Sequence, residues 1–208
     1  MTFISTVITD RYLTVMADRR ATSILPDGNY GDPVAEDAQK IIQVSKNSFY
    51  AIVGAVETTL SFMQVTKFED TIFTRLGIIK EKNINPWLDE NKNTLLSVPS
   101  SFQFIFGGLT SLGTYKVYSL DSKTAELSYI ERESGKLNYN VFSSDCFPYQ
   151  GEIAAIWLEE ITTMHPHNTS RDMIRIQSEL NDKVADVDKS VNKAKTIFVI
   201  DFEEPAHP

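Results

Sequence analysis

The chain has 208 residues, of which 42% are hydrophobic and 23% charged, a composition typical of a soluble globular protein with one domain. Its net charge of −8 argues against nucleic-acid binding, because phosphate contacts need a concentrated basic surface. No apolar run approaches the roughly 20 residues that span a bilayer, and the N-terminus lacks the features of a secretory signal. The single cysteine, Cys146, cannot form an internal disulfide. We therefore expect a cytoplasmic protein without membrane or nucleic-acid partners.

The N-terminal quarter of the chain is predicted to be β structure, because it is rich in Ile, Val, Thr and Tyr. Four strands are expected, at residues 3–9, 12–17, 41–44 and 49–53. Only Asp10 and Arg11 separate the first two, which is the length of a tight hairpin. Residues 23–37 contain Pro26, Asp27-Gly28 and Pro33 and are predicted to form a loop.

A helical period follows this β segment. Apolar residues recur at intervals of three and four and predict one helix over residues 56–76, with its apolar face made by Val65, Phe68, Ile72 and Leu76. A shorter helix is predicted to begin at Asn85-Pro86 and to end near Ser97.

The C-terminal half of the chain begins with a second β segment. Its strands are expected at residues 102–107, 115–120, 126–131 and 137–142. Two helices are predicted next, the first with the stripe Ile153, Trp157, Ile161 and Met164, and the second with the stripe Met173, Ile176, Leu180, Val184 and Val187.

The start of the second helix and the C-terminal residues also have recognisable sequence patterns. Thr169 with Asp172 is expected to form a capping box at the start of the second helix. A final strand is expected over residues 196–202, and the acidic residues 203–208 are expected to be a flexible tail. The order of strands and helices indicates two packed sheets with helices outside.

Five segments form one pattern along the chain: ADRRAT at residues 17–22, AQKIIQV at 38–44, YAIVGA at 50–55, FIFGG at 104–108 and KVYSLD at 116–121. Together they resemble one known family, the proteasome β-subunits and related bacterial threonine peptidases. The spacing from Thr2 to Asp18 matches that family without a gap. The resemblance extends over about residues 2–60 and 102–122. It implies an α+β fold, the four-layer α/β/β/α sandwich of N-terminal-nucleophile (Ntn) hydrolases, as a single domain over residues 1–202.

The resemblance assigns catalytic roles to Thr2, Asp18, Lys40 and Gly54. Thr2, freed by removal of Met1, carries both the nucleophilic hydroxyl and an α-amine that can act as the base, because its pKa lies near 8. The ammonium of Lys40 would lower that pKa further, and Asp18 would pair with Lys40. The N–H of Gly54 would stabilise the oxyanion.

Weaker supporting roles fall to Arg20, the arginine of the ADRRAT motif, and to Asp186, Asp188 and Ser190. The family has an Asp and a Ser three residues apart before its penultimate strand. Here Asp186 lies four residues before Ser190, and Asp188 lies two residues before it. The family also has a Gly-Ser-Gly loop that supports the nucleophile, and residues 143–151 contain no such motif.

Other candidate residues have simpler explanations. His165 and His167 flank a proline without a matching carboxylate, which is typical of a loop rather than of a metal site. Cys146 has no neighbouring histidine that would activate it. We expect no metal and no cofactor.

Two functions remain open. One is a threonine-type hydrolase of peptide or amide bonds that works as a homo-oligomer joined through its helical layers. The other is a catalytically silent Ntn-fold structural or assembly subunit that retains Met1, because a fold does not determine function.

Overall fold

The computed structural model describes residues 2–24, 30–143 and 169–202. The chain divides into two compact units, one formed by Met1–Ile41 with Glu133–Pro208 and the other by Ile42–Arg132. The first unit is discontinuous, since the second is inserted between its two segments. The single-domain organisation stays a prediction.

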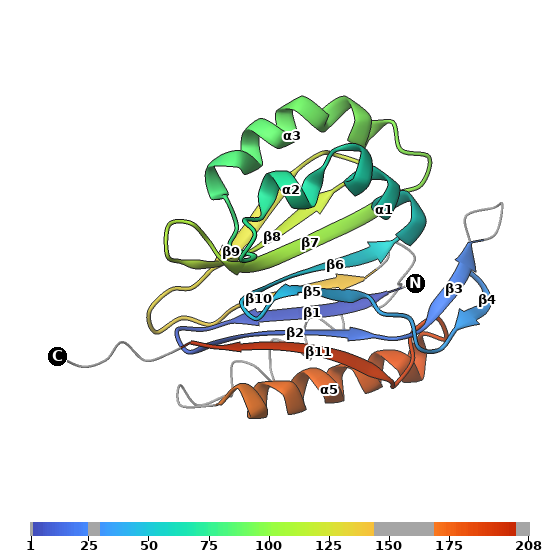
Figure 1. Cartoon of the computed structure of the whole chain (residues 1–208). Helices are drawn as coiled ribbons and strands as arrows, with labels where there is room; N and C mark the ends of the chain where they lie inside the picture. Colours follow the sequence, from blue (N-terminus) through green and yellow to red (C-terminus); the bar gives the residue numbers. More distant parts are fainter. Residues whose placement is uncertain (1, 25–29, 144–168, 203–208) are drawn as a thin grey trace. The chain divides into compact units, whose positions relative to one another are not determined.

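The first unit contains a four-stranded antiparallel sheet in the order β10-β1-β2-β11 (Figure 1). Its strands are β1 Phe3–Ile8, β2 Tyr12–Asp18, β10 Asn138–Ser143 and β11 Lys195–Asp201. The predicted hairpin is confirmed, with the Thr9 N–H donating to the Tyr12 carbonyl at 2.9 Å. Strands from the two ends of the chain therefore share this sheet.

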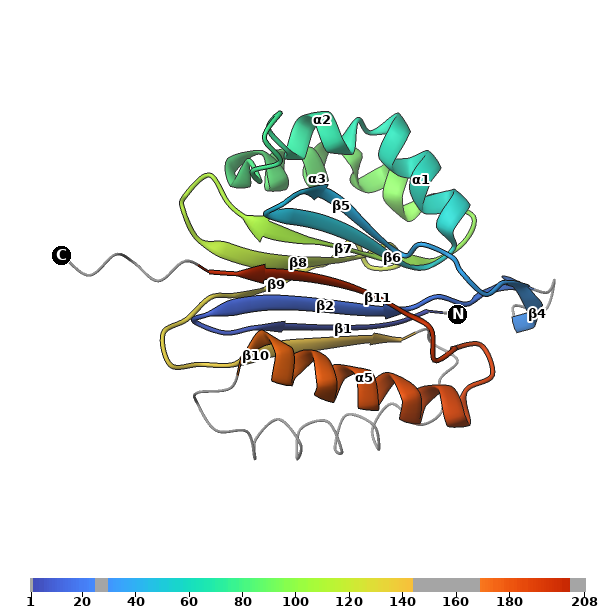
Figure 2. The same ribbon diagram turned by 60° about the horizontal axis from the view of Figure 1, so that its bottom comes forward.

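Helix α5, Ser170–Val187, runs along this sheet (Figure 2). The predicted capping box is confirmed, because the Thr169 hydroxyl accepts from the Asp172 N–H while the Asp172 carboxylate accepts from the Thr169 N–H. Four of the five predicted stripe residues are buried: Met173, Ile176, Leu180 and Val184. Val187 is exposed, contrary to prediction, because it is the last residue of the helix and Asp188 is already extended.

The loop predicted over residues 23–37 is wrong in part. Strands β3, Ala21–Ile24, and β4, Tyr30–Ala35, pair antiparallel in a separate two-stranded sheet. Register shifts at Thr22 interrupt the ladder, where Thr22 is opposite Pro33. The proline lies in a two-stranded ribbon, which tolerates its missing N–H. Residues 21–24 and 30–35 thus form paired strands rather than parts of a continuous loop, and the predicted turn residues Pro26, Asp27 and Gly28 lie outside the described residues.

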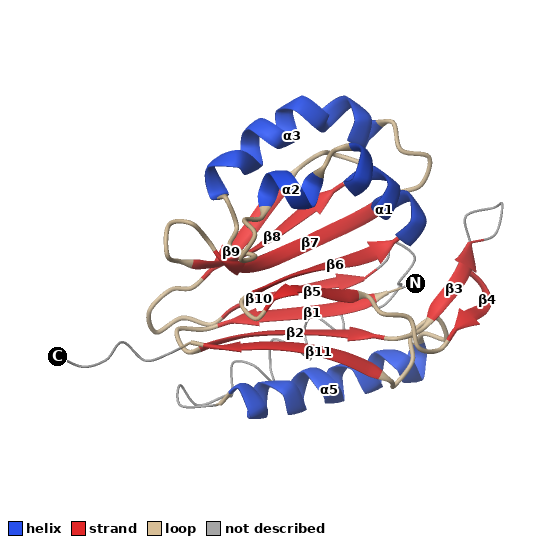
Figure 3. Ribbon diagram, viewed as in Figure 1, coloured by secondary structure: helices blue, strands red, loops and turns tan. Residues whose placement is uncertain are grey.

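The second unit contains a five-stranded sheet in the order β5-β6-β7-β8-β9 (Figure 3). The strands are β5 Ile41–Ser45, β6 Ser48–Gly54, β7 Phe102–Leu109, β8 Tyr115–Asp121 and β9 Leu127–Glu131. All five fall where the sequence predicts strands, within two residues at each end.

The single helix predicted over residues 56–76 is wrong. It divides into α1, Val56–Val65, and α2, Phe68–Ile72, at Lys67, whose φ of 50° is left-handed. Phe68 and Ile72 are buried as expected, but Val65 is 69% exposed and Leu76 78% exposed. Val65 is the last residue of α1 and Leu76 lies in a turn after α2, so the two ends of the predicted stripe are not on a continuous buried helix face.

Helix α3, Glu81–Leu96, begins four residues before the predicted start, with Pro86 inside it. Ile84 and Trp87 lie on its buried face. None of the helices in the described ranges combines the length and apolar character needed to cross a membrane.

The core of the second unit is centred on Phe68. Its ring makes edge contacts with Trp87, Phe104 and Phe106, at centroid distances of 5.2, 4.7 and 5.2 Å. The indole N–H of Trp87 donates to the Thr66 carbonyl at 3.1 Å, so the helix break is tied to the core. Aromatic pairs of this geometry add about 0.5–1.5 kcal/mol each to the burial term.

Part of the sequence prediction falls outside the described residues. This part includes the helix with the stripe Ile153, Trp157, Ile161 and Met164, the residues Cys146, His165 and His167, and the tail 203–208.

Candidate active site

Asp18 is the last residue of β2 and is completely buried. Its Oδ1 accepts from the Phe3 N–H at 2.8 Å and from the Lys40 ammonium at 2.7 Å. Its Oδ2 accepts from the Arg20 N–H at 3.0 Å. Each donor belongs to a different segment, so this carboxylate joins the start of β1, the end of β2 and the residue before β5.

Lys40 lies directly before β5 and is 3% exposed. The expected ion pair with Asp18 is present in the structure. Burial lowers the pKa of Lys40, whereas the carboxylates of Asp18 and Asp188 act in the opposite direction and the cation of Arg20 adds to the lowering. A buried ammonium beside one strong partner can influence the proton affinity of neighbouring groups.

Thr2 lies next to this pair because of the register of the β1–β2 hairpin. Ile4 is opposite Ala17, which places Phe3 opposite Asp18 at the end of the ladder. Thr2 is one residue further and is joined by its peptide bond to the nitrogen that donates to Asp18. A slip of one residue in the hairpin would exchange the faces of all its side chains, so the hairpin register determines the place of Thr2. Thr2 is 2% exposed.

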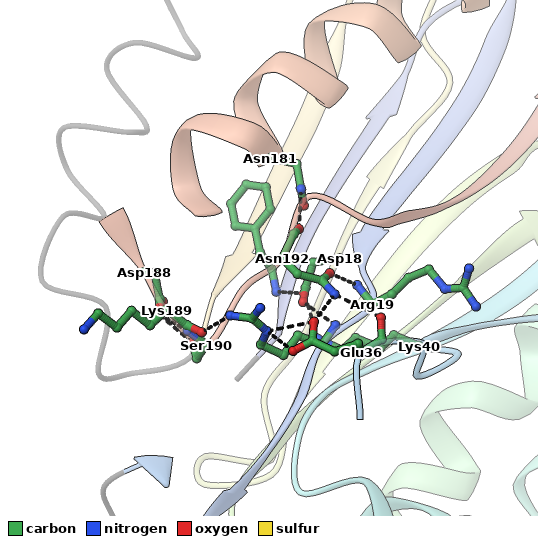
Figure 4. A network of polar contacts seen from close by, with 11 residues as sticks. Asp18, Arg19, Glu36, Lys40, Asn181, Asp188, Lys189, Ser190 and Asn192 are labelled. Carbon is green, nitrogen blue, oxygen red and sulfur yellow. Dashed lines mark hydrogen bonds and ion pairs between the residues drawn. The ribbon is translucent and has the colours of Figure 1, made fainter. Parts of the chain in front are cut away.

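Arg20 connects Asp18 to a wider polar network (Figure 4). Its Nε lies 2.9 Å from a Glu36 carboxylate oxygen, and one terminal nitrogen donates to the Lys189 carbonyl. Asn192 donates to both the carboxylate and the carbonyl of Glu36, at 2.9 and 3.0 Å. Hydrogen bonding from Asn192 and Arg20 lowers the pKa of Glu36.

Asp186, in the last turn of α5, has different partners from Asp188 and Ser190, which follow the helix. Ser190 donates to Asp188 Oδ1 through its N–H at 2.8 Å and through its hydroxyl at 2.5 Å. Figure 4 shows this pair beside Lys189, in the same network as Asp18. Asp186 instead pairs with Lys193 at 2.6 Å, and both side chains are more than half exposed. Of the four residues with weaker predicted roles, Arg20, Asp188 and Ser190 belong to the network around the Asp18–Lys40 pair, and Asp186 does not.

Gly54 ends β6 and belongs to the second unit. Its φ of 98° lies in the range that favours glycine, and a Cβ there would meet the Ser101 carbonyl oxygen at 2.9 Å. Local sheet geometry therefore requires glycine at this position whether or not its N–H binds an oxyanion.

Sequence reasoning missed Glu36 and Asn192, and also Asn181, whose side-chain amide donates to the Asn192 carbonyl. Asn192 bonds to residues 156 and 173 positions away, a distance at which no local pattern operates. Within the described ranges no three His, Cys, Asp or Glu side chains gather as metal ligands.

No protein-family model matches the sequence, and no curated protein matches it. Solved structures do match. Eukaryotic HslV from Trypanosoma brucei is 11% identical, with a TM-score of 0.60, over 96% of this chain and 99% of its own. A mutant of Anbu from Hyphomicrobium sp. strain MC1 is 12% identical, with a TM-score of 0.64, over 97% of this chain and 82% of its own. At such low identity the likeness concerns the fold alone. The chain has the sandwich fold of the proteasome-type N-terminal-nucleophile hydrolases.

Proposed function

We propose that the chain is an N-terminal-threonine hydrolase of peptide or amide bonds, with Thr2 as its nucleophile after removal of Met1. The observation that carries this proposal is the shared carboxylate of Asp18. One of its oxygens holds both the Lys40 ammonium and the amide that directly follows Thr2. The lysine and the residue that follows the proposed nucleophile are therefore held by the same carboxylate oxygen.

The chemistry needs no group beyond the chain and a water molecule. The Thr2 α-amine, in its neutral form, takes the hydroxyl proton as Oγ1 attacks the substrate carbonyl carbon. The tetrahedral intermediate collapses as the proton passes to the leaving amine, and an ester to Thr2 remains. Water, deprotonated by the same amine, then cleaves the ester. Lys40 keeps the α-amine neutral at lower pH, because a second positive charge nearby disfavours protonation.

Gly54 is proposed to supply an N–H to the oxyanion, a role that rests on the family resemblance. One such donor is typically worth roughly 3 kcal/mol of transition-state stabilisation. We also propose a cytoplasmic homo-oligomer joined through the helical layers.

Three forms of the chain test this proposal: wild type, Thr2→Ala and Thr2→Ser. Each second residue is small, so Met1 is removed equally well, and intact mass checks the processing of each. We expect wild type to cleave fluorogenic peptides, Thr2→Ser to retain part of that activity and Thr2→Ala to lose it. The wild-type rate should rise with pH through the α-amine pKa, at or below about 8. Unchanged hydrolysis by Thr2→Ala would remove Thr2 from the mechanism.

The second candidate function, a silent structural subunit, is favoured by the burial of Thr2, which is 2% exposed. A nucleophile must be reached by its substrate, whereas a structural threonine need not be. Retained Met1 in the intact mass, together with no hydrolysis, would establish this alternative, because an acylated α-amine cannot act as the base.

A further inference from the structure

Asn192 lies where three separate parts of the first unit meet. It follows α5 and is 8% exposed. Its Oδ1 accepts from the Arg19 N–H at 2.9 Å, directly after Asp18 in the chain. Its Nδ2 donates twice to Glu36, four residues before Lys40. Its carbonyl accepts from Asn181 of α5 at 2.9 Å.

These bonds connect the chain segment that carries Asp18 with the one that carries Lys40. Two further bonds fasten the same segments: the Ala38 N–H donates to the Arg19 carbonyl at 2.8 Å, and the Arg19 guanidinium donates to the Asp37 carbonyl at 3.2 Å. The Asn192 side chain uses its acceptor and its amino group at once, a set of bonds that a carboxylate or a hydroxyl could not reproduce. Figure 4 shows the Asn192 side chain bonded to both Arg19 and Glu36.

We propose that Asn192 is a positioning residue that holds Asp18 and Lys40 in the geometry of the site. This inference rests on the proposed function for its catalytic meaning, but its structural part can be measured in an inactive chain. Asn192 acts through its neighbours, since it is hydrogen-bonded to Arg19, Glu36 and Asn181. Loss of the Asn192 side chain should first increase the mobility of the Asp18 carboxylate.

The first arm measures amide hydrogen exchange by NMR. Loss of the Asn192 side chain directly frees the Arg19 N–H. If Asn192 positions the site, the amides of Phe3 and Arg20, which donate to Asp18, should also exchange about fivefold faster in Asn192→Ala, since a lost hydrogen bond contributes about 1 kcal/mol. If the Arg19 amide alone responds, the positioning role is overturned.

The second arm follows the titration of Lys40. The groups that act on its charge are Asp18, Asp188 and Arg20, together with burial, which lowers its pKa. Loosening the segment admits water, so in Asn192→Ala the pKa of Lys40 should rise toward its ordinary value. Carbon-13 NMR of the lysine Cε resonances, with Lys40 assigned through Lys40→Arg, measures this change. An unchanged titration contradicts the proposal.

Two further variants keep the test sharp. Glu36→Ala removes one acceptor of Asn192 at a side chain that is 57% exposed, so it should fold even if Asn192→Ala does not. Glu36→Ala should also raise the exchange rates of the Phe3 and Arg20 amides. Unchanged rates would overturn the proposal. Asn83→Ala is the matched control, because it also removes a side-chain amide bond to a carbonyl, that of Thr71, but in the second unit. It should leave the site amides unchanged.

Activity separates the two proposals. If wild type hydrolyses peptides, Asn192→Ala should lower kcat about tenfold to a hundredfold while KM changes little, because misplaced catalytic groups slow the chemical step. A raised KM with unchanged kcat would assign Asn192 to substrate binding instead and overturn its positioning role. If wild type is inactive, the proposed hydrolase fails, and the amide and Lys40 arms still decide the role of Asn192.

Discussion

Asp18 accepts hydrogen bonds from three segments of the chain and carries the charge that compensates the buried Lys40. Two buried charges gain little net stability as a pair, because both are removed from water. Removal of one member is different, since it leaves the other charge buried and uncompensated. The largest loss of stability is therefore expected when only one member of the ion pair is removed.

We expect Asp18→Asn to lower the free energy of unfolding by about 3–5 kcal/mol near neutral pH. Burial already lowers the pKa of Lys40. A lysine whose folded pKa is depressed destabilises the fold while it is protonated, and this penalty disappears as the pH rises from the folded pKa toward about 10.4, the unfolded value. The loss should therefore shrink between about pH 6 and about pH 9.5 in urea unfolding followed by circular dichroism.

The double variant Asp18→Asn/Lys40→Met is the control, because it removes both charges. Its stability should exceed that of Asp18→Asn at pH 6 and should depend less on pH. An equal penalty for Asp18→Asn at both pH values would show that the uncompensated lysine is not its cause.

Among the elements, sequence predicted those with strong local signals. The β1–β2 hairpin has a two-residue turn between β-rich runs, and α5 has a capping box with a regular apolar stripe. The break at Lys67 escaped prediction, because a lysine in the left-handed conformation has no sequence signature and tertiary packing of Phe68 imposes it. Strand β3 escaped prediction because it has only four residues and because the turn residues that follow it indicated a loop.

The capping box allows a prediction for α5. Thr169→Ala should lower the free energy of unfolding by about 1 kcal/mol, since it leaves the Asp172 N–H without its hydroxyl acceptor. Hydrogen bonds from the Thr169 N–H and hydroxyl lower the pKa of Asp172. The contribution of that carboxylate is therefore present above its unfolded pKa and is lost as the pH falls through the folded value.

Chemical denaturation of both chains at pH 7 and at about pH 2.5 measures these effects. Thr94→Ala, on the exposed side of α3, is the matched control and should change stability by less than about 0.5 kcal/mol. A loss for Thr169→Ala no greater than that for Thr94→Ala would contradict the capping role.

The candidate site could be predicted only in part. Asp18 and Lys40 were identified through the family resemblance, and their pairing is present in the structure. Glu36 and Asn192 were not, because their bonds depend on β11 and α5 returning to the first hairpin. The catalytic roles of Thr2 and Gly54 stay predictions.

At the scale of the whole molecule, helix α1 leaves apolar side chains in solvent. Val56 and Leu60, one helical turn apart, are 41% and 45% exposed. Exposed apolar patches on helices are typical of surfaces that join subunits. This surface supports the proposed assembly through the helical layers.

We expect the wild-type chain to show a multiple of the monomer mass by size-exclusion chromatography with light scattering, and Leu60→Glu to shift it toward the monomer. A charge introduced into an apolar interface is desolvated without a partner. Leu112→Glu is the control, because Leu112 is equally apolar and 62% exposed but lies in the turn between β7 and β8. A monomeric wild type, or dissociation by both variants, would contradict this interface.

The discontinuous first unit has a consequence for biosynthesis. Strand β11 pairs with β2, and Asn192 precedes it, so the surroundings of Asp18 cannot be completed until the ribosome has synthesised β11, Lys195–Asp201. At typical elongation rates this takes on the order of ten seconds or more after the hairpin has emerged. An aminopeptidase that frees Thr2 would have that interval in which to act, before the finished sheet encloses the residue.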